Sequence, residues 1–134
     1  PFWGWYNRRV EHVSVDRHAG AKALRHMVTA CVDRLAKGRQ VIIFPEGTRT
    51  APGEQLRYHP GVAAVYQQLP DGVAVVPIAL NSGKYWGRRK FLVNSGTITL
   101  QVLDPVMACA MPRKEFMVHL ERVVEEASTR LLDK

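Results

Sequence analysis

The stretch VIIFPEGTRT, residues 41–50, decides the fold of this 134-residue chain. Its first four residues are apolar. With Gln40 before them they form the run QVIIF over 40–44, which predicts a strand covered on both faces in a parallel sheet. Pro45 ends the run, and a carboxylate, a glycine, a hydroxyl and a guanidinium follow side by side. Ligands of such sheets collect beyond the carboxyl ends of the strands. The stretch therefore predicts a buried strand that delivers a cluster of polar groups to a binding site.

The rest of the chain predicts an alternation of strands and helices. Apolar stripes at helical spacing predict helices over 19–37 and about 112–133, and Pro60 is expected to open a shorter helix to about Leu69. Strands are expected at HVSV (12–15), VAVVPIAL (73–80, buried on both faces), KFLV (90–93) and TITLQVLDP (97–105, with Ile98, Leu100 and Val102 on one face). This order predicts the α/β class: a mainly parallel sheet flanked by helices, in a single domain over residues 1–134.

Composition and charge narrow the class of protein. Hydrophobic residues make up 46% of the chain, which is enough for a packed core. The longest apolar run, over 73–80, has eight residues, whereas a membrane-spanning helix needs about 20. The 19 Lys and Arg outnumber the 12 Asp and Glu, and the net charge of +7 favours an anionic partner. Cys31 and Cys109 are too few for a disulfide scaffold, and we expect free thiols in a reducing compartment.

Two arginines, Arg17 and Arg49, each come just after a predicted strand. If those strands are neighbours, both guanidiniums converge at one edge of the sheet, where a pair of guanidinium forks suits a phosphate dianion. Gly47 allows a close backbone approach or a positive φ angle. Thr48 adds a hydroxyl, and Glu46 can accept a hydrogen bond from a substrate hydroxyl or orient an arginine. A plain surface ion pair between Glu46 and Arg49 is the alternative.

Several motifs in this order resemble the glycerolipid acyltransferase family, and within it the bacterial lysophosphatidic acid acyltransferases. FPEGTR (44–49) is similar to the third motif of that family, VSVDR (13–17) to the second, and VVPIALNSG (75–83) to the fourth. Ser14 departs from the second motif, where Phe is frequent. The similarity continues through PFWGWYNRR, PGVAAVY, NSGKYWGRRKF and GTITLQVLDPV, so it covers essentially the whole chain.

This resemblance implies a fold like that of glycerol-3-phosphate acyltransferase and an activity in phospholipid biosynthesis. A fatty acyl group would pass from acyl-CoA or acyl carrier protein to lysophosphatidic acid, giving phosphatidic acid. Arg17 would bind the phosphate of the acceptor, while Glu46, Gly47, Thr48 and Arg49 would shape the glycerol phosphate site. The resemblance implies no metal and no prosthetic group. It also implies work at a membrane surface, which we expect to be the cytoplasmic face of the inner membrane.

The first motif of the family, His-x4-Asp, is not found in this sequence. In that motif the histidine acts as general base on the acceptor hydroxyl, and the aspartate orients the imidazole. None of the five histidines has Asp five positions later, and His12 and Asp16 are only four positions apart. The first motif precedes the second in the family. We therefore expect the C-terminal portion of an acyltransferase domain truncated at its N-terminus, with the acceptor site, without the catalytic base, and inactive alone.

Two other functions stay open from the sequence. A non-catalytic lipid-phosphate or anion-binding module would use Arg17 and Arg49 with the basic surface. A nucleic-acid binder would need exposed aromatic side chains interleaved with Lys and Arg, for which WGRRK (86–90) is the candidate. We expect no nucleic-acid partner. The same aromatic and basic stretch, like PFWGWYNRR (1–9), is also typical of an anchor at a membrane interface.

Overall fold

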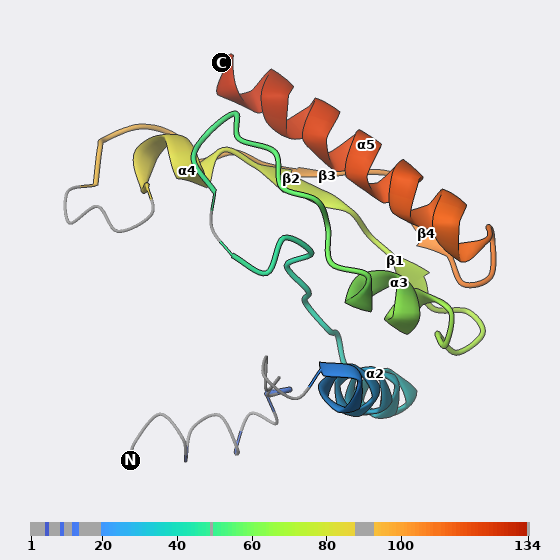
Figure 1. Cartoon of the computed structure of the whole chain (residues 1–134). Helices are drawn as coiled ribbons and strands as arrows, with labels where there is room; N and C mark the ends of the chain where they lie inside the picture. Colours follow the sequence, from blue (N-terminus) through green and yellow to red (C-terminus); the bar gives the residue numbers. More distant parts are fainter. Residues whose placement is uncertain are drawn as a thin grey trace. The chain divides into compact units, whose positions relative to one another are not determined.

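The computed structural model of the protein describes residues 5, 9, 12–13, 20–48, 50–87 and 93–133 (Figure 1). Two compact units make up the chain, Pro1–Val41 and Ile42–Lys134. The single domain expected over residues 1–134 stays a prediction. Arg17 and Arg49 lie outside the described residues, as do most of the strands predicted over 12–15 and 90–93. The described ends of those two segments, His12, Val13 and Val93, belong to no strand.

In the first unit, the helix predicted from the apolar stripe is confirmed as α2, Gly20–Ala36. It ends in a Schellman motif, in which Gly38 adopts a φ of 71° that favours glycine. The amide of Gly38 donates to the carbonyl of Leu35 at 2.9 Å. The amide of Arg39 donates to the carbonyl of Arg34 at 3.0 Å. Gly38 therefore ends the helix, whose last residue lies one position before the predicted end at residue 37.

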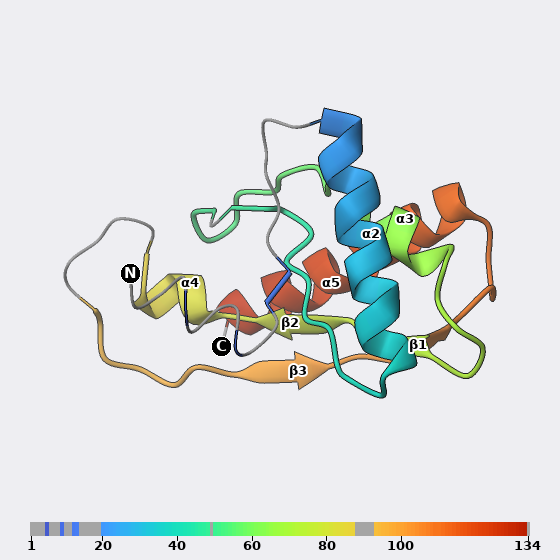
Figure 2. The same cartoon turned by 90° about the horizontal axis from the view of Figure 1, so that it is seen from below.

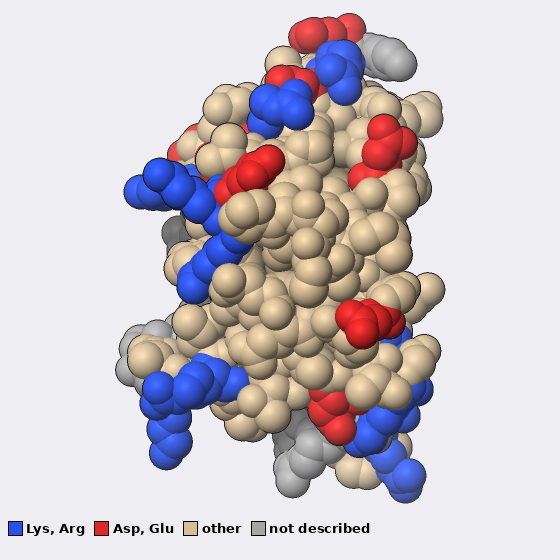
Figure 3. Space-filling model, turned by 90° about the vertical axis from the view of Figure 1, so that its right-hand side faces the viewer, with Lys and Arg blue, Asp and Glu red and all other residues tan. Residues whose placement is uncertain are grey.

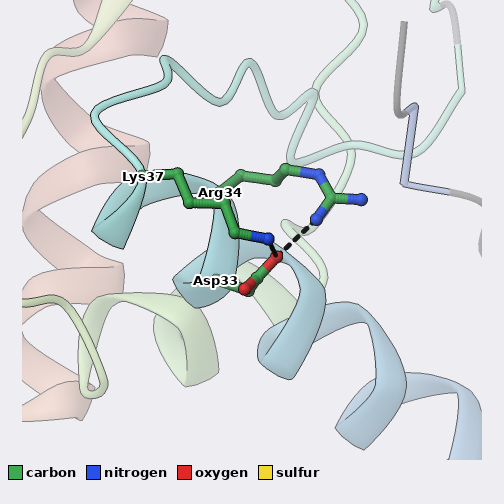
Figure 4. Close-up of polar contacts among 3 residues, drawn as sticks. All are labelled: Asp33, Arg34 and Lys37. Carbon is green, nitrogen blue, oxygen red and sulfur yellow. Dashed lines mark hydrogen bonds and ion pairs between the residues drawn. The ribbon is translucent and has the colours of Figure 1, made fainter. Parts of the chain in front are cut away.

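Charged side chains in and directly after the last turn of α2 support this helix end (Figure 4). Lys37 Nζ donates to Asp33 Oδ2 at 2.9 Å, and the guanidinium of Arg34 donates to the same oxygen. The hydrogen bond from Lys37 holds the pKa of Asp33 below its ordinary value. Positive charge here is favourable, because the C-terminal end of a helix carries a partial negative charge. Val28 and Cys31 are the buried residues of the apolar stripe, and Cys31 is a free thiol.

The second unit carries the remaining described elements. They are α3 (Gly61–Tyr66), β1 (Ala74–Val75), β2 (Ile78–Leu80), α4 (Ser82–Tyr85), β3 (Leu100–Val102), β4 (Val106–Met107) and α5 (Arg113–Leu132). β1 pairs with β4, and β2 pairs with β3, both antiparallel. Figure 2 shows β2 and β3 side by side. Among the described residues these strands form two separate two-stranded sheets, so the mainly parallel sheet of the prediction is not seen there.

The strand predicted over 73–80 is divided into β1 and β2. Pro77 lies between them and has no N–H to give to a ladder, which is why it interrupts the pairing. Its carbonyl still accepts a hydrogen bond from the amide of Leu103 at 3.0 Å, so the chain keeps its antiparallel course across the break. The prediction that this strand is buried on both faces is wrong, since Ile78 and Leu80 are exposed on either side of buried Ala79.

The prediction of a buried strand over 40–44 is also wrong. These residues form no strand, and Ile42 and Phe44 are 82% and 75% exposed. A strand needs a neighbour to satisfy its backbone N–H and C=O groups. Where the structure describes the chain, β2 pairs with β3 alone and offers this segment no such neighbour.

The core of the second unit lies between α5, α3 and the β2–β3 sheet. Figure 1 shows α5 running across β2 and β3, and Ala79 packs there with Ala127 and Leu131 of α5. The rings of Tyr66 in α3 and Phe116 in α5 stack with centroids 3.8 Å apart. The predicted stripe of the C-terminal helix is thereby confirmed, with four buried residues: Phe116, Leu120, Ala127 and Leu131. Among the described helices, none combines the length and the apolar character needed to cross a membrane.

The other face of the β2–β3 sheet is open. Its aliphatic side chains are 40–62% exposed, namely Ile78, Leu80, Leu100 and Val102. The register pairs Ala79 with Gln101, so Gln101 lies on the face toward α5. The alternation predicted for 97–105 is present in β3, but its apolar side is the uncovered one.

Candidate functional site

The predicted polar cluster lies in a loop, which we call the motif loop and define as residues 45–50, without Arg49. The amide of Gly47 donates to the carbonyl of Phe44 at 3.1 Å and closes a tight turn. Gly47 has a φ of 65°, in the left-handed region where a side chain adds strain. The positive φ that the sequence allows at this glycine is therefore confirmed.

His59 lies against this turn. A Cβ atom on Gly47 would be 2.8 Å from Cδ2 and 3.0 Å from Nε2 of the imidazole, so a larger residue at position 47 would require the ring to move. The backbone amide of His59 also donates to the carbonyl of Pro45 at 2.8 Å. The motif loop is thus held by both the backbone and the ring of the same residue.

Glu46 is half-buried, and a neighbour within the loop fixes its carboxylate. Thr50 Oγ1 donates to Glu46 Oε2 at 2.9 Å. Thr48 is exposed between them. The alternative ion pair of Glu46 with Arg49 involves a residue outside the described ones. The loop therefore presents an oriented carboxylate and an exposed hydroxyl on the two sides of the Gly47 turn.

Tyr58, the residue before His59, connects this region to α5 by a hydrogen bond. Tyr58 is 4% exposed, and its hydroxyl donates to Glu125 Oε1 at 2.9 Å. Burial raises the pKa of Tyr58, and the hydrogen bond to Glu125 raises it further, so the hydroxyl keeps its proton in neutral solution. Burial also raises the pKa of Glu125, and the charge of Glu46 adds to that rise. The carboxylate of the motif loop therefore acts electrostatically on the Tyr58–Glu125 pair.

A surface hollow of about 460 Å³ is lined in part by Glu125. Its lining is polar and carries charges of both signs. The lining residues are Gln55, Glu121, Arg122, Glu125, Glu126, Thr129 and Arg130. Gln55 is the one contribution from the segment that follows the motif loop. The hollow lies beside the Tyr58–Glu125 hydrogen bond and includes none of the predicted site residues. We therefore assign it no part in the site.

The fourth motif supplies a buried polar residue that the sequence did not single out. Asn81 directly follows β2 and is 3% exposed. Its Oδ1 accepts from the amide of Thr99 at 2.8 Å, and its Nδ2 donates to the carbonyls of Thr97 and Leu131, both at 3.4 Å. Asn81 therefore joins β2, the segment before β3 and the end of α5. The sequence signal that could have identified Asn81 is a polar residue immediately after an apolar strand.

Of the five predicted site residues, the structure describes Glu46, Gly47 and Thr48, which lie in one turn with His59 against Gly47. Arg17 and Arg49 lie outside the described residues, so the convergence of two guanidiniums stays a prediction. Within the described residues, no group of three or more His, Cys, Asp and Glu side chains is arranged to hold a metal ion. The sequence missed His59 and Tyr58 as part of this region, because their contacts join positions far apart in the chain.

This fold and this loop identify the class of protein. The model of the acyltransferase family matches residues 1–81, and the chain belongs to that family. It is 35% identical over 107 residues to the 1-acyl-sn-glycerol-3-phosphate acyltransferase of Pseudomonas aeruginosa, covering 80% of this chain and 40% of that protein. It is 28% identical over 145 residues to the lyso-ornithine lipid O-acyltransferase of the same organism, covering 95% of this chain and 54% of that protein.

A solved structure shares the fold. The crystal structure of the 1-acyl-sn-glycerophosphate (LPA) acyltransferase of Thermotoga maritima matches 100% of this chain with a TM-score of 0.76, at 24% identity. The match covers 53% of that chain. The chain thus spans about half of the length of these relatives or less.

Proposed function

We propose that the chain is part of an enzyme that acylates lysophosphatidic acid to phosphatidic acid. The observation that supports this best is the 35% identity over 107 residues to the Pseudomonas aeruginosa acyltransferase. The acyl donor is a thioester, acyl-CoA or acyl carrier protein. The acceptor oxygen forms an ester bond with the acyl carbonyl carbon, the carbon–sulfur bond breaks, and the thiol leaves with the proton of the hydroxyl.

In this proposal the motif loop holds the glycerol phosphate part of the acceptor. Glu46 and Thr48 meet the polar groups of the glycerol, and the Gly47 turn brings backbone close to it. Arg17 and Arg49 supply the positive charge for the phosphate, because guanidinium forks match its geometry. The fixed carboxylate of Glu46, held by Thr50 at 2.9 Å, supports this role. Pre-oriented polar groups bind a substrate with less ordering on association.

The general base is supplied by residues other than those of this sequence. The chain has no His-x4-Asp, and His12 is not a substitute in this proposal. The 134-residue chain alone is therefore expected to bind the acceptor without turning it over. The alternative, a non-catalytic module for lipid phosphate or other anions, predicts the same result for the chain alone. The two differ for the complete protein, which turns the acceptor over only if it is an enzyme.

The enzyme would work at a membrane surface, on the cytoplasmic face of the inner membrane. Two exposed tryptophans support this proposal, Trp5 at 55% and Trp86 at 56% exposed. The guanidinium carbon of Arg9 lies 5.6 Å from the ring centroid of Trp5, and this pairing of a cation with an aromatic ring suits a lipid interface. On the face shown in Figure 3, Lys and Arg form separate groups, with uncharged residues and some Asp and Glu between them.

A second acceptor is favoured by one specific observation. The Pseudomonas aeruginosa relative that covers 95% of this chain is an acyltransferase of lyso-ornithine lipid, a lipid named for ornithine rather than for glycerol phosphate. Arg17 separates the two acceptors, because its proposed role requires a phosphate.

The test uses the complete enzyme, assayed with lysophosphatidic acid and with lyso-ornithine lipid. We expect Arg17→Ala to raise the KM for lysophosphatidic acid by roughly tenfold or more, since a hydrogen bond to a charged group contributes about 1.5–3 kcal/mol. The KM for the thioester should change little. Equal losses for acceptor and thioester would contradict the phosphate role. A preference for lyso-ornithine lipid in the unaltered enzyme would favour the second acceptor.

A further inference from the structure

We propose that His59 is a positioning residue of the acceptor site. It holds the Glu46–Gly47–Thr48 turn in the geometry that binds the lipid. This rests on the proposed function of the motif loop. His59 lies outside both FPEGTR (44–49) and VVPIALNSG (75–83).

The contact with Gly47 is specific to the ring. The 2.8 Å and 3.0 Å distances from a Cβ at Gly47 to Cδ2 and Nε2 place the imidazole directly over the backbone at the centre of the turn. Nearby, the amide of His59 donates to Pro45 at 2.8 Å. The ring and the amide of one residue therefore contact the loop at Gly47 and at Pro45, with Glu46 between them.

The anchors of His59 are rigid on both sides. Tyr58, immediately before it, is buried and hydrogen-bonded to Glu125 of α5 at 2.9 Å. Pro60, immediately after it, has a fixed φ and precedes the first residue of α3. A residue held this way transmits the position of α5 and α3 to the motif loop. Glu46 and Thr48 flank the contact, so a shift of the Gly47 turn moves both proposed acceptor groups.

The first experiment measures steady-state kinetics of the complete enzyme with His59→Ala. Removal of the ring frees the turn, and small misplacements of substrate-binding groups have large effects on rate. We expect kcat/KM for the lipid acceptor to fall by roughly tenfold to a hundredfold, with the KM for the thioester unchanged. His59→Phe, which keeps a flat ring over Gly47, should recover most of the loss. His26→Ala, at an exposed histidine of α2, is the matched control and should leave both constants unchanged.

A double-mutant cycle tests the contact itself. Gly47→Ala places a methyl group against the imidazole in the presence of His59, and against open space in the presence of His59→Ala. The strain of the positive φ is the same in both backgrounds and cancels. We expect Gly47→Ala to lower acceptor kcat/KM by at least about tenfold more in the His59 background than in the His59→Ala background. The same cycle on the urea midpoint should show coupling of the same sign.

The two experiments separate this proposal from the proposed function. Coupling in the urea cycle does not depend on which lipid is acylated, and each kinetic assay is run with lysophosphatidic acid and with lyso-ornithine lipid. An enzyme that acylates only the second lipid overturns the proposed acceptor, yet still supports His59 if the acceptor effect and the coupling appear. Additive effects of the two substitutions, or equal losses for acceptor and thioester in His59→Ala, would overturn the positioning role.

Discussion

The two faces of the β2–β3 sheet differ sharply in their environment. On the face toward α5, Ala79 is 1% exposed and packs with Ala127 and Leu131, which are 0% and 2% exposed. On the other face, four larger aliphatic side chains are 40–62% exposed: Ile78, Leu80, Leu100 and Val102. The small residue is therefore the covered one, and the large apolar residues are open.

This difference shows what strand periodicity leaves undecided. Alternation places residues on two faces but does not say which face another element will cover. α5 can approach the sheet closely because Ala79 and Ala127 are small. Contiguous exposed aliphatic side chains are typical of surfaces that contact a partner. Ile42 and Phe44, just before the motif loop, are exposed in the same way.

The largest predicted effect is on the covered side of the comparison. Phe116→Ala removes the ring that stacks on Tyr66 at 3.8 Å and leaves a cavity under α5. We expect a loss of about 3–5 kcal/mol in the free energy of unfolding, measured by urea titration. Val118→Ala on the same helix is the control, because Val118 is 63% exposed, and its effect should stay within about 0.5 kcal/mol. Similar losses for both variants would mean that α5 is not packed as described.

Two separate variants, each with one substitution on one face of the sheet, compare the two faces directly. Ala79→Val adds methyl groups between β2 and α5, where there is no space, and should cost about 1–3 kcal/mol of unfolding free energy. Val102→Ala removes methyl groups from the open face and should cost less than about 1 kcal/mol, since the side chain is 62% exposed. Urea unfolding of both variants provides the measurement. A larger loss at Val102 than at Ala79 would show that the open face is covered in solution.

The helices could be predicted from the sequence because their signals are local. The apolar stripes place α2 and α5, and Gly38 after α2 identifies its end. The positive φ of Gly47 was likewise open to prediction, since glycine next to a proline-terminated run is typical of a turn. Each of these features depends on residues within a few positions of one another.

The strands and the surroundings of the site depend on distant residues and could not be predicted in the same way. The segment over 40–44 has the composition of a core strand, but composition does not supply the neighbour that a strand needs. Tyr58 and Glu125 are 67 positions apart, and no local pattern joins them. His59 meets Gly47 only because the motif loop folds back on the start of α3. The placement of Arg17 and Arg49 stays a prediction.

The smallest predicted effect concerns the pH dependence of stability at Glu125. Burial raises the pKa of its carboxyl group, so the folded state holds the proton more tightly than the unfolded state. A raised carboxyl pKa makes the protein lose stability as pH rises from the ordinary value through the raised value. Glu125→Gln keeps an oxygen to accept from Tyr58 and never ionises. The difference in unfolding free energy between Glu125→Gln and the unaltered protein should therefore shift in favour of the variant as pH rises from about 4 to 7.

The size of this shift should be under about 1 kcal/mol, because Glu125 is only half-buried and water screens its charge. Tyr58→Phe provides the opposite case. The hydrogen bond from Tyr58 lowers the pKa of Glu125, so its removal should raise that pKa further and make the loss of stability with pH steeper. Urea titrations of the three proteins across the same pH range measure both slopes. If the unfolding free energy of all three proteins changes with pH at the same rate, water fully screens the charge of Glu125. That result would contradict an electrostatic link between α5 and the motif loop.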